Sequence, residues 1–287
     1  MLDAYIDGWQ IHSSTTNPNG IYLKPGLKGL SSAAMRYSGQ DRIGMGGHDP
    51  INQLYGGHIL PWQGFIDAQD SGTYYQRRRD LFDHFAIAKD ANGDPVRKVL
   101  TFTMPDGLGY RMEVLLNGEI DSPHERVIGG DFFLPLLAPE PQIYGQSLVT
   151  TSAITPPTGG GAVLPWVLPI VLGGSSGGNV TTTNNGTIYT WPTLTLTGAL
   201  TNPYILNSAN GDHFQLQCTL APTDTVAIDM LKQTVTLNGA SSLLSTITDD
   251  STFFVLEKGA NAISFSSGST ADTGTLTLSY YHAWAGV

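Results

Sequence analysis

The stretch IYTWPTLTLTG, residues 188–198, decides the fold of the second half of this 287-residue chain. Threonine and leucine alternate from Thr193 to Thr197, and TLTL at 275–278 repeats the pattern. Successive side chains of a strand point to opposite faces, so leucine is expected inside and threonine outside. The pattern predicts antiparallel strands with one buried face.

Further strand-like runs follow at the spacing of an antiparallel sandwich. They are residues 202–209, 213–221, 224–231, 233–239, 251–259, 261–267 and 274–284. Turn dipeptides such as Asn210-Gly211 and Asn238-Gly239 separate some of them. The second half is therefore predicted to be all-β.

The most apolar stretch, AVLPWVLPIVL at 162–172, begins directly after TPPTGGG at 155–161. Eleven residues cannot span a bilayer, which needs about 20, so no membrane insertion is expected. Its two prolines exclude a helix and suit the first strand of a second domain. The residues expected to be buried there are Val163, Trp166, Leu168 and Ile170.

Charge divides the chain into two parts. Residues 1–146 hold 12 of the 14 Lys and Arg and 17 of the 24 Asp and Glu, so the second half is almost uncharged. We predict an N-terminal domain at 1–146, a linker at 147–161 and a C-terminal domain at 162–287. The net charge of −10 disfavours binding to nucleic acid.

The N-terminal domain is predicted to be mainly β with one helix at about 71–88, capped by Asp70 or Ser71. Strands are expected at 2–12, 58–68, 96–104, 110–120 and 131–139. The glycine-rich residues 29–57 are interpreted as a long surface excursion. The first ten residues, MLDAYIDGWQ, lack the pattern of a secretory signal.

Few residues suggest catalysis or metal binding. Asp90–Asp94 resembles the start of a calcium loop, but its glycine is fourth instead of sixth, which favours a plain turn. Asp229 and the adjacent pair Asp249-Asp250 are weak candidates for a glycosidase. The single cysteine, Cys218, is expected to be a small buried hydrophobe. We expect no enzyme activity, no metal and no cofactor.

Two groups of side chains are candidate contact surfaces. The predicted helix carries Tyr75 and Arg77, Arg78 and Arg79, which would meet a partner subunit or protein. The second half also carries tryptophan and tyrosine residues. Those proposed as a surface for glycan or protein contact are Trp191, Tyr204, Tyr281 and Trp284.

The order of motifs over about 163–284 resembles the C-terminal domain of siphophage distal tail proteins. The carriers are N-x-G-T in NNGTIYTWP, the run NPYILN, IDMLKQTVTLNG, STFFVLEKGANAISF and a last strand ending in YYHAW. The helix TYYQRRRDLFDHF and the segment DFFLPLLAPEPQIYG resemble the N-terminal domain of the same family.

This resemblance implies a structural virion protein. Its fold would be an N-terminal β-sandwich-like ring domain with one helix, followed by a galectin-like or carbohydrate-module-like β-sandwich. Six copies would form a ring at the tail tip, with DNA passing through the lumen without specific binding. Implied partners are the tail tube, tape-measure and tail-tip or tail-associated proteins, with a receptor-binding protein as a further candidate. Assembly would take place in the host cytoplasm.

A stand-alone carbohydrate-binding protein is the alternative. It predicts a monomer that binds glycans, whereas the family predicts a particle of about six subunits. Aromatic residues on a sandwich face can hold sugar rings, and the sequence does not fix which face they occupy.

Overall fold

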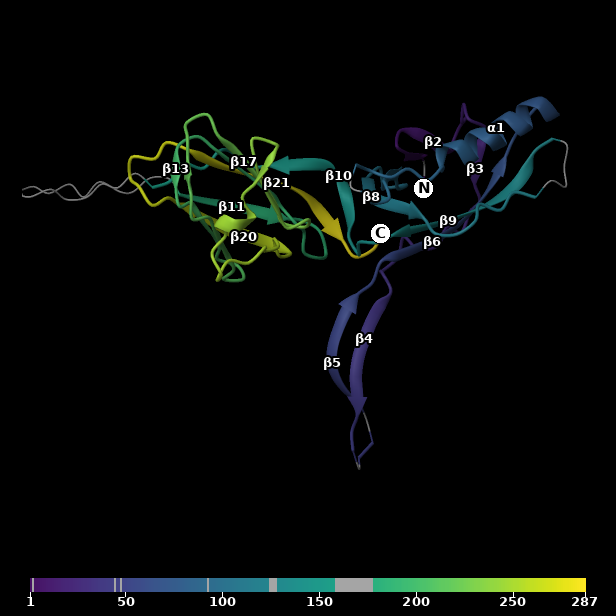
Figure 1. The fold of residues 1–287 in the computed structure, drawn as a ribbon. Helices are drawn as coiled ribbons and strands as arrows, with labels where there is room; N and C mark the ends of the chain where they lie inside the picture. Colours follow the sequence, from purple (N-terminus) through teal and green to yellow (C-terminus); the bar gives the residue numbers. More distant parts are fainter. Residues whose placement is uncertain (2, 44, 47, 92, 124–127, 158–177) are drawn as a thin grey trace, which may run out of the picture. The chain divides into compact units, whose positions relative to one another are not determined.

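The computed structural model describes residues 1, 3–43, 45–46, 48–91, 93–123, 128–157 and 178–287. They form two compact units (Figure 1). Unit 1 comprises Met1–Gln146 together with Trp284–Val287, and unit 2 comprises Ser147–Ala283. Both are built mainly from antiparallel strands, which confirms the predicted fold class. Within the described residues no helix is long and apolar enough to cross a membrane.

Unit 1 contains two sheets that share one strand. The first has the order β10-β8-β7-β1-β2, and the second runs β3-β6-β9-β8. The strands are β1 Asp3–Ile6, β2 Trp9–Ser13, β3 Ile21–Leu23, β6 His58–Ile66, β7 Lys98–Thr103, β8 Gly109–Leu116, β9 Gly130–Ala138 and β10 Ile143–Thr150. The five strand regions expected in the first half are present; β3 and β10 were not predicted.

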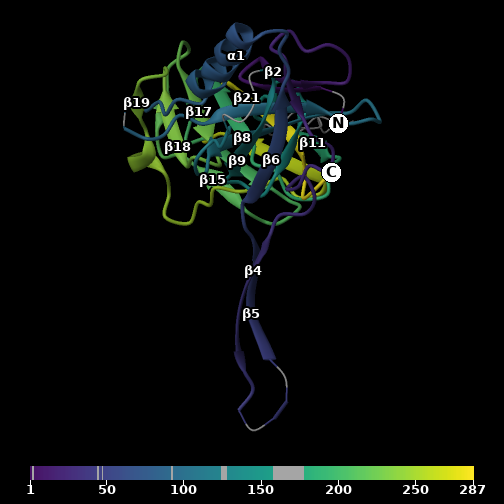
Figure 2. The ribbon, with the colours of Figure 1, turned by 90° about the vertical axis from the view of Figure 1, so that its right-hand side faces the viewer.

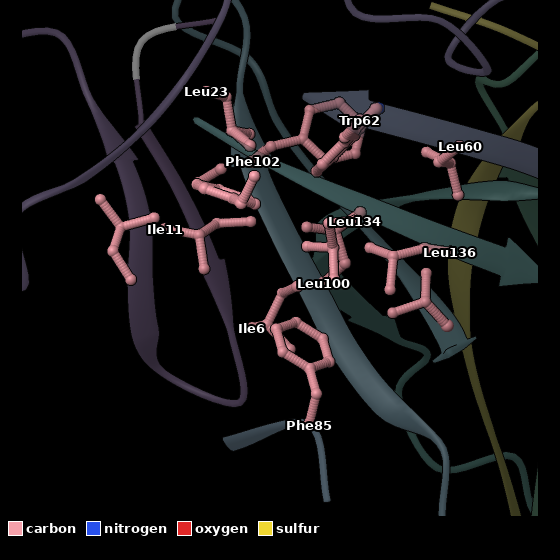
Figure 3. Packing of buried hydrophobic residues seen from close by; sticks show 14 of the residues in the cluster. Ile6, Ile11, Leu23, Leu60, Trp62, Phe85, Leu100, Phe102, Leu134 and Leu136 are labelled. Carbon is pink, nitrogen blue, oxygen red and sulfur yellow. The ribbon is translucent and has the colours of Figure 1, made fainter. Parts of the chain in front are cut away.

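The core of unit 1 lies between these sheets (Figure 3). Trp62 of β6 is fully buried, and its indole N–H donates to the Lys28 carbonyl at 3.0 Å. Leu100 and Phe102 of β7 face the same interior as Leu134 of β9. The alternating apolar positions of β6 and β9 thus supply much of the packing surface.

One α-helix, α1 at Ser71–His84, occurs in the described residues. Asp70 is its N-cap, as predicted, and its carboxylate accepts from Thr73 N–H at 2.8 Å. The Thr73 hydroxyl also donates to this carboxylate, and the hydrogen bonds from Thr73 lower the pKa of Asp70. The helix ends earlier than the expected residue 88, because Phe85 turns into the core and Ala88 O instead accepts from Val96 N–H.

Unit 2 is a sandwich of two antiparallel sheets. One has the order β19-β18-β17-β12-β21 and the other β11-β20-β14-β15, while β13 and β16 form a short pair. The elements are β11 Asn179–Asn184, β12 Thr193–Thr197, β13 Leu200–Thr201, β14 Tyr204–Asn207, β15 His213–Gln215, β16 Thr219–Leu220, β17 Thr225–Asp229, β18 Thr234–Leu237, β19 Ser241–Ser242, the 3₁₀ turn η1 Leu244–Thr246, β20 Gly259–Ser266 and β21 Thr275–Trp284.

The alternation of leucine and threonine is confirmed. Leu194 and Leu196 of β12 are fully buried, as are Leu276 and Leu278 of β21. The two strands pair directly, with Leu194 opposite Leu278, so their leucines form one apolar layer. Phe265 of β20 belongs to the same core, which places the second sheet against that layer.

The region between the units differs from the expected linker where it is described. Residues 147–150 complete β10, and Ile154 is buried and exchanges backbone hydrogen bonds with Leu276. The chain end also differs: Trp284–Val287 groups with unit 1, where Val287 N–H donates to Leu30 O. The apolar stretch 162–172, with its four residues expected to be buried, lies outside the described residues.

The predicted strand at 251–259 is wrong for most of its length. Apart from single bridges at Leu256 and Lys258, the residues before Gly259 are not in a strand. Their backbone groups bind asparagine side chains instead, since Asn207 Nδ2 donates to Val255 O and Asn261 Nδ2 donates to Glu257 O.

Two histidines of unit 1, His12 and His84, are half-buried and have lowered pKa values. Burial is the main cause that lowers the pKa of both His12 and His84, with the positive amino terminus adding to it at His12 and Lys98 at His84. His12 Nδ1 accepts from Leu23 N–H at 3.2 Å, which requires that nitrogen to be unprotonated. His84 stacks on Trp9 with ring centroids 4.6 Å apart.

We expect the free energy of unfolding to fall as the pH drops from about 7 to about 5. Below about pH 6.5 the unfolded chain protonates both imidazoles while the folded chain resists it, so stability rises with pH in this window. Urea titrations across the range should show a smaller slope for the double variant His12→Gln, His84→Gln than for the native chain. Equal slopes in the two proteins would contradict this assignment.

Candidate assembly surfaces

Residues 29–57, left unassigned by sequence motifs, contain a long hairpin. Strand β4 at Met35–Asp41 pairs with β5 at His48–Tyr55 and forms a separate two-stranded sheet. Two views show it as a ribbon that extends away from the sheets of unit 1 (Figures 1 and 2). An isolated two-stranded ribbon is marginally stable in water, so this hairpin is a candidate for contact with another molecule.

The hairpin has one predominantly apolar face. Met35 pairs with Tyr55 and Tyr37 with Gln53, which places these residues on the same side. Alternation along β5 adds Ile51, next to the bulge between Ser38 and Gly39. The four residues Met35, Tyr37, Ile51 and Tyr55, called the hairpin face below, are 37% to 70% exposed. The opposite side carries mostly polar residues.

The arginines of α1 are only partly available for a partner. The Arg77 guanidinium donates to Asp67 O, and Arg78 donates to Ser122 O at 3.0 Å while stacking over the Phe82 ring. Both therefore hold α1 within unit 1. Arg79 is exposed and contacts only its helix neighbour Gln76 among the hydrogen bonds described.

Tyr75 is 38% exposed on the same helix, and its ring meets that of the buried Tyr74 edge-on at 5.3 Å. Together with Arg79 it keeps the helix as a candidate contact surface. The predicted role of these residues as an interface stays a prediction.

The four candidate aromatic residues do not form one surface. Tyr204 lies on β14 of the four-stranded sheet and Tyr281 on β21 of the other sheet of the sandwich. Trp191 is half-buried against the core of unit 2, whereas Trp284 groups with unit 1 and packs edge-on against Tyr110 at 5.3 Å. Sequence reasoning placed them together because it could not assign strand faces.

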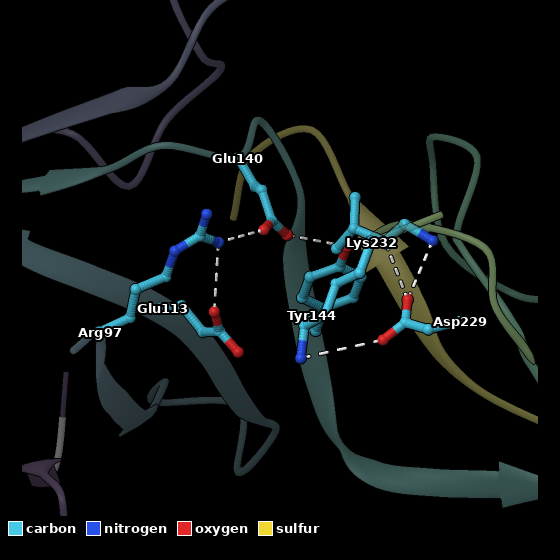
Figure 4. Close-up of polar contacts among 7 residues, drawn as sticks. Arg97, Glu113, Glu140, Tyr144, Asp229 and Lys232 are labelled. Atoms are coloured by element: carbon cyan, nitrogen blue, oxygen red, sulfur yellow. Dashed lines mark hydrogen bonds and ion pairs between the residues drawn. The ribbon is translucent and has the colours of Figure 1, made fainter. Parts of the chain in front are cut away.

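Two of the carboxylates considered for catalysis, Asp229 and Asp250, have structural partners. Asp229 accepts from Leu231 N–H and Lys232 N–H at 3.0 and 2.9 Å, which closes the turn after β17 (Figure 4). Asp250 lies 3.2 Å from His213 Nε2. Hydrogen bonds, chiefly from the Thr248 hydroxyl, lower the pKa of Asp250.

A separate ion-pair cluster lies in unit 1 (Figure 4). Arg97 contacts Glu140 at 2.7 Å and Glu113 at 3.3 Å. The Tyr144 hydroxyl completes it by donating to Glu140 at 3.4 Å. No group of His, Cys, Asp and Glu in the described part of the chain has the geometry of a metal site.

A comparison with protein families gives a match within unit 2. Residues 185–284 match the family described as the siphovirus-type tail component, C-terminal domain. The match lies within unit 2 and extends to Trp284. No curated protein matches the chain.

The fold resembles that of a Dit protein over most of the chain. It is similar to the Dit protein of phage SPP1, described as a paradigm of the hub adsorption apparatus in phages that infect Gram-positive bacteria, with a TM-score of 0.66, 11% identity and coverage of 98% of both chains. A chain of the phage P2 baseplate in its activated conformation with calcium matches with a TM-score of 0.52, 7% identity and coverage of 96% and 97%. The fold of the chain is therefore Dit-like, and the similar chains come from a phage hub adsorption apparatus and a phage baseplate.

The Dit-like motifs now have a physical explanation in unit 2. The asparagines of N-x-G-T, NPYILN and GANAI are Asn184, Asn207 and Asn261, and all three are buried. Each side chain binds backbone groups of a non-strand segment: Asn184 Nδ2 donates to Ile188 O, and Asn261 Oδ1 accepts from Glu257 N–H. The family pattern therefore identifies residues that support the fold, and it identifies no catalytic residue.

The hairpin face is the surface that sequence reasoning missed. Its signal was present, since Met35 and Tyr37, and Ile51 and Tyr55, are apolar residues at even spacing within a glycine-rich region. The bulge at Ser38 and Gly39 interrupts the pairing register, so simple alternation does not extend across the hairpin.

Proposed function

We propose that this Dit-like chain is the distal tail protein of a siphophage. Six copies form a ring through unit 1 at the tip of the tail. The ring joins the tail tube to the tail-tip or baseplate proteins that bind the host, and it leaves a channel for DNA. The proposal is carried by the family match of unit 2 together with a Dit fold over 98% of the chain.

Two physical features support a ring. The hairpin face exposes apolar side chains to water, and exposed apolar patches of this kind mark sites of contact with another protein. The net charge of −10 favours a lumen to which DNA does not adhere. Tail tube, tape-measure, tail-tip and receptor-binding proteins are the proposed partners, with assembly in the host cytoplasm before the protein joins the virion.

Light scattering coupled to size exclusion tests the proposal with the purified full chain. We expect a particle of about six times 30.7 kDa. A mass that stays at one subunit at the highest attainable concentration would contradict the ring.

Binding of saccharide by unit 2 remains a second candidate because of one local arrangement. Tyr204 stacks on His213 with centroids 5.2 Å apart, at half-buried positions whose neighbours Ile205 and Phe214 face the core. The pair therefore lies on the outer side of its sheet. A glycan array with the native chain and Tyr204→Ala distinguishes the two functions: binding that the substitution removes supports a saccharide site, and no binding by the native chain excludes it for the glycans presented.

A further inference from the structure

Unit 1 carries a second exposed apolar surface besides the hairpin face. It is a groove of about 230 Å³ between the chain segments that follow α1 and the ends of β8 and β9. The residues that define this groove are Phe85, Ile87, Pro95, Val96, Leu115 and Leu116. Ile87 is 81% exposed at its rim, so the groove is open to an incoming side chain.

The groove is suited to an apolar occupant. Lys98 is the charged residue among those that line it, and its ammonium group is paired with Asp7 at 3.1 Å. A cavity of about 150 Å³ lined by apolar residues holds a ring the size of benzene. This larger groove therefore has room for one or two side chains such as those of Ile51 and Tyr55 on the hairpin face.

The exposed apolar residues of unit 1 concentrate at these two places. Of the 13 large hydrophobic residues of unit 1 that are exposed in the described part of the chain, seven lie on the hairpin, from Met35 to Tyr55, and Ile87 and Val96 border the groove. Most of the exposed apolar residues of unit 1 therefore lie either on the hairpin or at the groove.

Charge favours a second copy of this chain as the occupant. The hairpin contains Arg36, Asp41, Arg42 and Asp49, so its formal charge is zero in a chain of net charge −10. Copies of an acidic protein repel one another, and a neutral apolar element is the part that can approach a neighbour at the lowest electrostatic cost. Its Arg42 and Asp49 are moreover paired at 2.6 Å.

We propose that the hairpin face of one copy packs into the groove of the next copy. This rests on the proposed function and adds to it the identity of the two contacting surfaces. Because the two surfaces differ, the contact is head-to-tail, and such contacts generate closed rings when the rotation between neighbours closes. Burying the hairpin face in this way also removes apolar surface from water.

Disulfide cross-linking tests the pairing. In a Cys218→Ser background, the variant with Ile51→Cys and Ile87→Cys should form a ladder of covalent oligomers under mild oxidation. The matched control carries Ile51→Cys with Leu108→Cys, because Leu108 is exposed on unit 1 but lies outside the groove. We expect the control to give no ladder above the background of random collisions.

Charge substitution gives an independent measurement. Ile51→Asp and Ile87→Asp should each raise the dissociation constant between copies at least about tenfold, since each buries an unpaired carboxylate, whereas Leu108→Asp should not. If the native chain assembles but neither Asp variant weakens it and no ladder forms, the hairpin–groove contact is wrong and the ring stands. A monomeric native chain overturns both.

Discussion

Replacing Asn261 with alanine is expected to lower the free energy of unfolding of unit 2 by about 2–4 kcal/mol. Asn261 is fully buried, and its side-chain amide makes four hydrogen bonds. It donates to Glu257 O and Gly259 O at 2.8 and 3.0 Å, and it accepts from Glu257 N–H and Asn207 Nδ2 at 2.9 and 3.2 Å. Alanine leaves these partners without the bonds that the irregular segment before β20 depends on.

Asn185→Ala is the matched control, because Asn185 is exposed and its side-chain amide lies 3.5 Å from His282 Nε2, a long contact. It should change stability by less than about 0.5 kcal/mol. Urea unfolding of the full chain, followed by circular dichroism, measures both variants. Similar losses for the two would mean that Asn261 does not support the fold in the manner described.

Gly186→Ala is expected to lower the free energy of unfolding of unit 2 by about 3 kcal/mol or more. A Cβ atom at this position would lie 1.8 Å from Ala283 O and 2.7 Å from Ala283 N, which is backbone and cannot turn aside. The same carbonyl accepts from Thr187 and Ile188 N–H, so any shift that relieves the clash weakens the turn. This explains the glycine of the N-x-G-T motif.

Gly211→Ala separates this steric effect from backbone strain. Gly211 has a φ of +81°, and no atom lies within 4 Å of the position that a Cβ atom would take, so alanine there suffers only the conformational cost of about 1–2 kcal/mol. Thermal and urea unfolding of both variants should rank Gly186→Ala as the more damaging. A larger loss of stability for Gly211→Ala would show that the backbone of Ala283 can move away from a Cβ atom at position 186 at little cost.

Local sequence patterns predicted the strands and the helix whose signal lies within a few neighbouring residues. The alternation around Leu194 and Leu276 identified β12 and β21 because a strand with one buried face has a period of two. Asp70 and the spacing of apolar residues identified the start of α1. These signals are contained within a few residues.

Features that depend on distant residues were not predicted. The segment from Ser251 to Leu256 has the composition of a strand, but Asn207 binds its backbone from 48 residues away along the chain. Strand β21 runs without interruption to Trp284, so the local sequence could not show that the chain end groups with unit 1. For the candidate surfaces, the sequence pointed to Tyr75, Arg77, Arg78 and Arg79 as contact residues, of which Tyr75 and Arg79 are exposed, and it missed the hairpin face.

The central claim, a ring closed through unit 1, is tested most directly by electron microscopy of the purified native chain. We expect closed particles with sixfold symmetry, an open lumen and the hairpin of each copy against the next copy. Isolated monomers, or symmetric dimers in which the hairpins remain uncovered, would contradict it.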